Sequence, residues 1–178
     1  RRWHVGVMTA VLIPIAFVAQ LLAIALLFVL GQTSVPGLGS VSLAVLLILI
    51  VVGITEELAK SLHIYAAYDH GRFDRSMKTA LALGLASGVG FFLAEKIALL
   101  AQLVGLPQLD VGEAGLQGGV VVGPVLLLFL LAPLALHVGT AAISAVGASR
   151  GKTEYAIAVA CAMVIHIVYN LTVVVLVV

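Results

Sequence analysis

The chain is poor in charged residues, which make up only 10% of its 178 amino acids, whereas an ordinary soluble domain has about 25%. It has no run of lysine and arginine, which argues against nucleic acid as a partner. Its one cysteine, Cys161, cannot form a disulfide within the chain, and we expect it to be a small core residue. In place of these features, 63% of the residues are hydrophobic, which is typical of an integral membrane protein.

Five apolar segments are each long enough to cross roughly 30 Å of hydrocarbon as a helix. They are approximately Val5–Leu30, Val41–Tyr68, Thr79–Val104, Gly118–Ala148 and Thr153–Val178. No repeat or second domain is visible, so we expect an all-α, polytopic membrane helix bundle that forms a single domain over residues 1–178. Because the chain starts with Arg1 and not methionine, we expect it to be part of a longer protein. Gly84 and Gly88 form a small-xxx-small pair that predicts close helix packing.

The basic residues gather on one side of the predicted membrane. Seven of the nine lie before the first segment or in the second and fourth connectors: Arg1, Arg2, Arg72, Arg75, Lys78, Arg150 and Lys152. The positive-inside rule assigns that side to the cytoplasm. We therefore predict a protein of the cell membrane with a cytoplasmic N-terminus and an external C-terminus.

Ionisable residues also occur inside the apolar segments. The stretch "GITEELAKSLHIY" contains Glu56, Glu57 and Lys60, the next segment Glu95 and Lys96, and the last two segments His137, His166 and Asn170. A charged group near the bilayer centre costs about 2.5–3.5 kcal/mol, so these side chains should face the bundle interior and pair or bind something. Glu56, Glu95 and both histidines lie within about four residues of their segment midpoints, hence within roughly 6 Å of one layer.

The spacing inside the second segment leaves its pairing undecided. Lys60 follows Glu56 by four residues and Glu57 by three, so it can reach either carboxylate along one helix face. Lys60 and its glutamate partner could form a structural ion pair, or the three residues could be part of a catalytic site. We expect His63 to lie at the membrane interface and Lys96 to extend outward to water.

The residue types in this layer are those of a hydrolytic site. Two imidazoles and a carboxylate form a ligand set for catalytic zinc that leaves a position for water. A second carboxylate can act as general base, and Asn170 can donate a hydrogen bond to a developing oxyanion. A metal-independent variant, in which a glutamate and a histidine activate the water together, is the other possibility. Either variant predicts hydrolysis within or beside the membrane.

These motifs resemble those of the PrsW family of intramembrane proteases. "EELAK", "FFLAE", "APLALHVGT" and "HIVYN" match, in order, the family's EExxK motif, its FxxxE motif, its later histidine and its HxxxN-type motif. The resemblance runs from about Gly53 to Asn170, and Lys96 departs from it because the family usually has Asn there. By position, Glu56, Glu57, Lys60 and Asn170 are assigned as catalytic residues, with Glu56 favoured as base, and Glu95, His137 and His166 as zinc ligands.

The resemblance implies a multi-pass peptidase that cuts a membrane-anchored protein, such as an anti-sigma factor, near the outer face. CAAX prenyl proteases of the wider superfamily carry EExxxR and FxxxH, which Lys60 and Glu95 do not match, whereas YhfC-type membrane peptidases remain a near neighbour. A proton-coupled transporter is an alternative, because buried acids and histidines also build proton relays, and a catalytically silent scaffold is another. A carrier should show broken helices at mid-membrane, so the continuous apolar runs favour the enzyme.

Overall fold

The computed structural model describes residues 18, 43–105 and 119–177. These residues form helices and no strand: α2 (Leu43–Asp69), α3 (Met77–Gly105), α5 (Gly119–Arg150) and α6 (Lys152–Val177). Each helix begins and ends within two residues of the segment predicted for it, and the all-α prediction is confirmed for this part of the chain. The predicted first helix, Val5–Leu30, lies outside the described residues except for Val18.

Three of the described helices contain stretches that are long and apolar enough to cross a membrane. The stretches are Met77–Ala98, Leu130–Arg150 and Lys152–Val175. α2 is also long, with 27 residues, but Glu56, Glu57 and Lys60 interrupt its apolar sequence. The architecture is therefore the polytopic membrane helix bundle that the sequence indicates.

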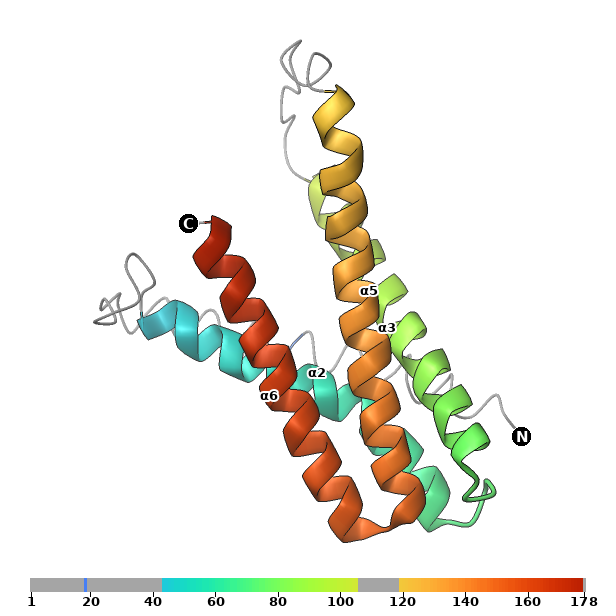
Figure 1. Ribbon diagram of the computed structural model, residues 1–178. Helices are drawn as coiled ribbons and strands as arrows, with labels where there is room; N and C mark the ends of the chain where they lie inside the picture. Colours follow the sequence, from blue (N-terminus) through green and yellow to red (C-terminus); the bar gives the residue numbers. More distant parts are fainter. Residues whose placement is uncertain (1–17, 19–42, 106–118, 178) are drawn as a thin grey trace.

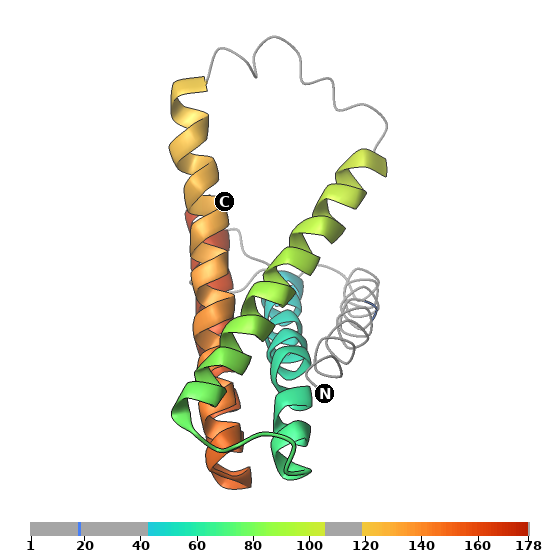
Figure 2. The ribbon, with the colours of Figure 1, turned by 90° about the vertical axis from the view of Figure 1, so that its right-hand side faces the viewer.

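α5 packs against the three other described helices, with α3 and α6 beside it and α2 crossing the bundle obliquely (Figure 1). The connection between α2 and α3 and the turn between α5 and α6 lie at the same end of the bundle, the lower end in both views. Toward the other end, α3 and α5 diverge (Figure 2). The two basic connectors that the sequence assigns to one side therefore lie at one end of the bundle.

Two glycines allow α3 to approach α5 closely. A Cβ atom at Gly84 would lie 2.5 Å from the Cα of Ala142, and one at Gly88 would lie 2.6 Å from the carbonyl oxygen of His137. Side chains cannot approach a backbone so closely, so only glycine permits this packing. The close packing predicted from the small-xxx-small pair is confirmed, and Gly88 places α3 against the turn of α5 that carries His137.

A single residue, Gly151, joins α5 to α6. Its φ angle of 149° lies in a region that favours glycine. Its N–H donates to the carbonyl of Gly147 at 3.2 Å, and its own carbonyl accepts from the N–H of Tyr155 at 3.0 Å. The chain therefore reverses direction with almost no loop, and α5 and α6 form a tight antiparallel hairpin.

The start of α3 is fixed by short polar side chains in its first turn and just before it. The Ser76 hydroxyl accepts from the N–H of Thr79 at 3.2 Å, as an N-cap does, while a carboxylate oxygen of Asp74 accepts from the N–H of Ser76 at 3.0 Å. The Thr79 hydroxyl donates to the other carboxylate oxygen at 2.8 Å. Hydrogen bonds from Ser76 and Thr79 lower the pKa of Asp74.

The apolar core lies toward the end of the bundle with the two connections. It consists of Ile64, Tyr68, Ala80, Ala145, Ala148, Tyr155 and Val159. Tyr65 stacks on Tyr155 beside it, with ring centroids 4.5 Å apart. Cys161 is exposed, so the expectation that it belongs to the core is wrong. It lies on the outer face of α6, where its low polarity suits a hydrocarbon surrounding.

Candidate active site

A cavity of about 650 Å³ lies among the four described helices. Each helix contributes ionisable or polar groups to its lining: Glu56 from α2, Glu95 from α3, His137 from α5, and His166 with Asn170 from α6. The remaining lining includes apolar side chains such as Leu49, Val52, Pro133, Leu136 and Val173. The structure thus brings together the four ionisable residues that the sequence places in one layer.

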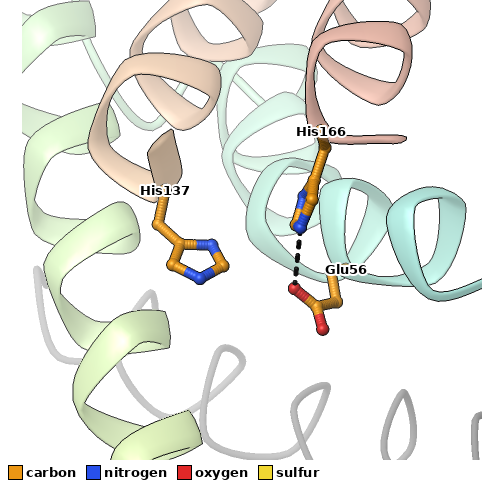
Figure 3. A group of neighbouring side chains, drawn as sticks. All are labelled: Glu56, His137 and His166. Carbon is orange, nitrogen blue, oxygen red and sulfur yellow. Dashed lines mark ion pairs between the residues drawn. The ribbon is translucent and has the colours of Figure 1, made fainter. Parts of the chain in front are cut away.

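Three of these residues form a compact group of potential metal ligands. Glu56, His137 and His166 are buried, and each offers one ligand atom within 4.8 Å of the other two. Figure 3 shows Glu56 and His166 facing one another, with His137 beside them on α5. The Nε2 atom of His166 lies 3.5 Å from a carboxylate oxygen of Glu56, and the two imidazole centroids are 5.4 Å apart. The carboxylate in this group is Glu56, whereas the sequence assigns Glu95 to the ligand set.

Glu95 contacts His137 from α3. One of its oxygens accepts a hydrogen bond from Nε2 of His137 at 2.8 Å, and the other accepts from the ammonium of Lys96 at 2.8 Å. The expectation that Lys96 extends outward to water is wrong, because its ammonium pairs with Glu95 and lies 5.3 Å from the centre of the Phe92 ring. An ion pair lowers the cost of placing both charges in hydrocarbon. Glu95 keeps 35% of its side chain exposed.

Glu57 and Lys60 form an ion pair next to the cavity, and neither side chain has any exposed surface. The ammonium donates to Oε1 of Glu57 at 2.5 Å, and Nδ1 of His166 donates to the same oxygen at 2.6 Å. Spacing alone allowed Lys60 to reach either glutamate, and the structure places it on Glu57. Because Glu57 binds Nδ1 of His166, the Nε2 atom of that ring is the one turned toward Glu56.

Lys60 also connects α2 to α5. Its ammonium lies 3.1 Å from Nδ1 of His137 and donates to the hydroxyl of Thr140 at 3.1 Å. The Phe91 ring centre is 5.3 Å away, and the Ser87 hydroxyl donates to the backbone carbonyl of Lys60 at 2.7 Å. Sequence reasoning missed Thr140 and Ser87. Thr140 could have been found, because it follows His137 by three residues and so shares its helix face.

Two further polar residues of the apolar segments take different positions. Asn170 lines the cavity one helical turn after His166, as its spacing suggests. The expectation that His63 lies at the depth of the membrane interface stays a prediction, but its side chain faces the bundle interior. It is 1% exposed, and its Nδ1 lies 3.3 Å from the carbonyl oxygen of Ala59. His63 follows Glu56 by seven residues, so it lies on the inner face of α2.

The chemistry of the donor atoms fits a zinc ion. Two imidazoles and a carboxylate, each from a different helix, are ligand types that catalytic zinc uses, with a further position left for water or substrate. A carboxylate that accepts a hydrogen bond from one ring nitrogen orients the imidazole, and Glu57 does so at Nδ1 of His166, which leaves Nε2 of that ring to bind an ion. Both ring nitrogens of His137 are in contact, Nε2 with Glu95 and Nδ1 with Lys60, so His137 must release one of these contacts to bind the ion. The ligand atoms of the three residues lie within 4.8 Å of one another, and they must come closer together for all three to contact one zinc ion.

Comparison with known proteins agrees with this geometry. The family model described as PrsW family intramembrane metalloprotease matches residues 3–178. No curated protein and no solved structure matches the chain. The family match extends beyond the motif-bearing segment, Gly53 to Asn170, in which the resemblance was first visible.

Proposed function

The chain belongs to the PrsW family of intramembrane metalloproteases, and we propose that it hydrolyses a peptide bond of a membrane-anchored protein by a Glu/His-assisted mechanism. The observation that carries this proposal is the buried group of Glu56, His137 and His166 at the wall of a 650 Å³ cavity. The cavity is large enough to admit a short stretch of extended chain. Its apolar walls suit a substrate segment that leaves the bilayer.

We propose Glu56, His137 and His166 as the residues that would hold a zinc ion. Such an ion, when bound, supplies a Lewis acid that polarises the scissile carbonyl and increases the acidity of water. Glu57 orients His166 through Nδ1, and Lys60 holds Glu57 in place. The chain's own hydrogen bonds therefore set the ring orientations before any substrate enters.

Glu95 is then the general base of the proposed mechanism. It is partly exposed and lines the cavity, so water can reach it. It would take a proton from the attacking water, whose oxygen bonds to the carbonyl carbon, and pass that proton to the amine nitrogen as the peptide bond breaks. Asn170 can donate a hydrogen bond to the oxyanion that forms. The assignment made from the sequence, with Glu95 as ligand and Glu56 as base, stays the competing prediction.

The position of the cavity supports cleavage toward the outer face. Its lining includes Leu49 and Val52 from the first half of α2 and Val173 from the last part of α6. These parts of the helices lie away from the basic connectors, which we assign to the cytoplasm by the positive-inside rule. A membrane-anchored protein with an external domain, such as an anti-sigma factor, is therefore the substrate that we propose.

The test uses the purified protein in liposomes with a fluorogenic single-span substrate. Glu56→Gln and Glu95→Gln should each lower proteolysis by a factor of about 10² or more, while Thr153→Val, a change at an exposed residue that does not line the cavity, should not. Zinc titration against a competing dye separates the two roles. We expect Glu56→Gln to weaken zinc binding at least about tenfold, because it replaces a ligand, and Glu95→Gln to weaken it less, because the amide oxygen can still accept a hydrogen bond from His137.

Two outcomes would change these conclusions. If Glu95→Gln weakens zinc binding and Glu56→Gln does not, the roles of the two carboxylates are those assigned from the sequence. If both variants cleave the substrate at the rate of the unchanged protein, the proposed peptidase site is wrong.

A further inference from the structure

The ammonium of Lys60 has a complete set of hydrogen-bond partners. A lysine ammonium has three N–H donors and no acceptor. The structure supplies three acceptor atoms: Oε1 of Glu57 at 2.5 Å, Nδ1 of His137 at 3.1 Å and the hydroxyl of Thr140 at 3.1 Å. The lysine side chain has no exposed surface, so bulk water does not compete for these donors. Loss of any one acceptor leaves an N–H donor buried without a partner, which is unfavourable.

Thr140 is arranged to act as the acceptor in its contact with Lys60. It is 1% exposed, and its hydroxyl donates its single proton to the carbonyl of Leu136 at 3.0 Å. The lone pairs of the oxygen therefore face the ammonium. Because Thr140 follows His137 by three residues, its hydroxyl and the imidazole contact the same ammonium from one face of α5.

We propose that Thr140 is a positioning residue of the active site, which acts through Lys60 to fix the orientation of His137. The inference rests on the function proposed above, because it assigns a role in that site. Of the three acceptors, Glu57 is anionic and binds the ammonium most strongly. Without the Thr140 hydroxyl, Lys60 is drawn toward Glu57, and the contact that loosens is the one to His137. The catalytic rate should fall, whereas substrate binding should change little.

A pair of matched variants tests the role of the hydroxyl. Thr140→Val replaces the hydroxyl by a methyl group of similar size, and Thr140→Ser keeps the hydroxyl. In the liposome assay we expect Thr140→Val to lower kcat about tenfold or more with KM within about twofold, because a small misplacement of a reacting group is costly. Thr140→Ser should keep at least about a third of kcat, since its hydrogen bonds are retained.

Ser144→Ala is the control for a change at the same helix face. Ser144 lies one turn after Thr140, is fully buried, and its hydroxyl has no hydrogen-bond partner among the described residues. Its removal should leave kcat unchanged. Thermal unfolding of all three variants identifies any loss that comes from folding alone, and Thr140→Ala takes the place of Thr140→Val if the latter does not fold.

A second measurement does not depend on proteolysis. The protein has five histidines, so ¹⁵N-imidazole labelling in micelles gives few signals, and His137→Gln identifies those of His137. We expect Thr140→Val to shift the His137 signals, because Lys60 no longer fixes its Nδ1 as an acceptor, and Thr140→Ser to leave them in place.

The inference is overturned if Thr140→Val keeps full kcat and unshifted His137 signals. It is also overturned if Thr140→Ser is as impaired as Thr140→Val, because the side-chain volume and not the hydroxyl would then be responsible. If no variant and not even the unchanged protein cleaves the substrate, the proposed function fails. The imidazole signals still decide the positioning role in that case.

Discussion

The buried pair of Lys60 and Glu57 gives the largest stability effect that we expect from a single substitution. Lys60→Met keeps most of the side-chain volume but removes the charge, and Glu57 is then an anion with no exposed surface. Its Oε1 keeps Nδ1 of His166, and its Oε2 has no hydrogen-bond partner among the described residues. Breaking a buried ion pair by removing one partner costs about 3–5 kcal/mol, so Lys60→Met should be strongly destabilising as well as inactive.

Lys96→Met is the matched comparison. The Lys96–Glu95 pair has the same chemistry and an N···O distance of 2.8 Å, but its side chains are 22% and 35% exposed. Glu95 lines the cavity, where water can reach it, and keeps its hydrogen bond from His137 when Lys96 is replaced. Ion pairs that water reaches contribute about 0–1 kcal/mol. At about 2–4 °C per kcal/mol for a chain of this size, we expect melting temperatures lower by roughly 6–20 °C for Lys60→Met and roughly 0–4 °C for Lys96→Met.

The assay is thermal unfolding in one detergent, followed by circular dichroism, with a third variant that combines Lys60→Met and Glu57→Gln. Removing the stranded negative charge should restore part of the lost stability, since the amide can still accept the hydrogen bond from His166. Equal shifts for Lys60→Met and Lys96→Met, or no recovery in the combined variant, would refute the conclusion that burial of the ion pair determines the effect.

The remaining predictions concern helix packing and orientation. Gly88→Ala places a Cβ atom 2.6 Å from the His137 carbonyl oxygen, so the free energy of unfolding should fall by about 1–3 kcal/mol and cleavage should fall too. Gly90→Ala, whose added Cβ atom would have nothing within 4 Å, should behave like the unchanged protein in melting and proteolysis assays. A cysteine at Arg72, in a Cys161→Ser background because Cys161 is exposed, should react with an impermeant maleimide only after the cells are opened. Labelling of that cysteine in intact cells would reverse the assigned orientation.

The fold of the described residues could be predicted closely from sequence because membrane helices follow directly from apolar length. Backbone groups in hydrocarbon must be paired within the segment, which leaves the helix as the structure of each long apolar run. The glycine pair in α3 likewise indicated close packing, although the sequence did not show that the partner helix is α5. That information depends on the arrangement of all helices in space.

The site could be predicted as a set of residues but not as a set of contacts. Depth along each helix placed Glu56, Glu95 and the two histidines in one layer, and they line one cavity. The partner of Lys60 was ambiguous because adjacent glutamates are both within its reach, and contacts to α5 and α6 distinguish them. The contact between Lys96 and Glu95 was missed because the prediction that Lys96 extends outward to water did not consider the adjacent carboxylate of Glu95.

The one-residue turn at Gly151 fixes how far along α5 and α6 the two histidines of the active site lie. His137 lies fourteen residues before Gly151 and His166 fifteen residues after it, which corresponds to about 21 and 22 Å of helix. The two imidazoles lie at the same depth in the bundle because nearly equal numbers of residues separate them from Gly151. Insertion or deletion of one residue in either arm would move one ring by about 1.5 Å and turn it by about 100°. Length variation should therefore be tolerated only outside the stretch from His137 to His166.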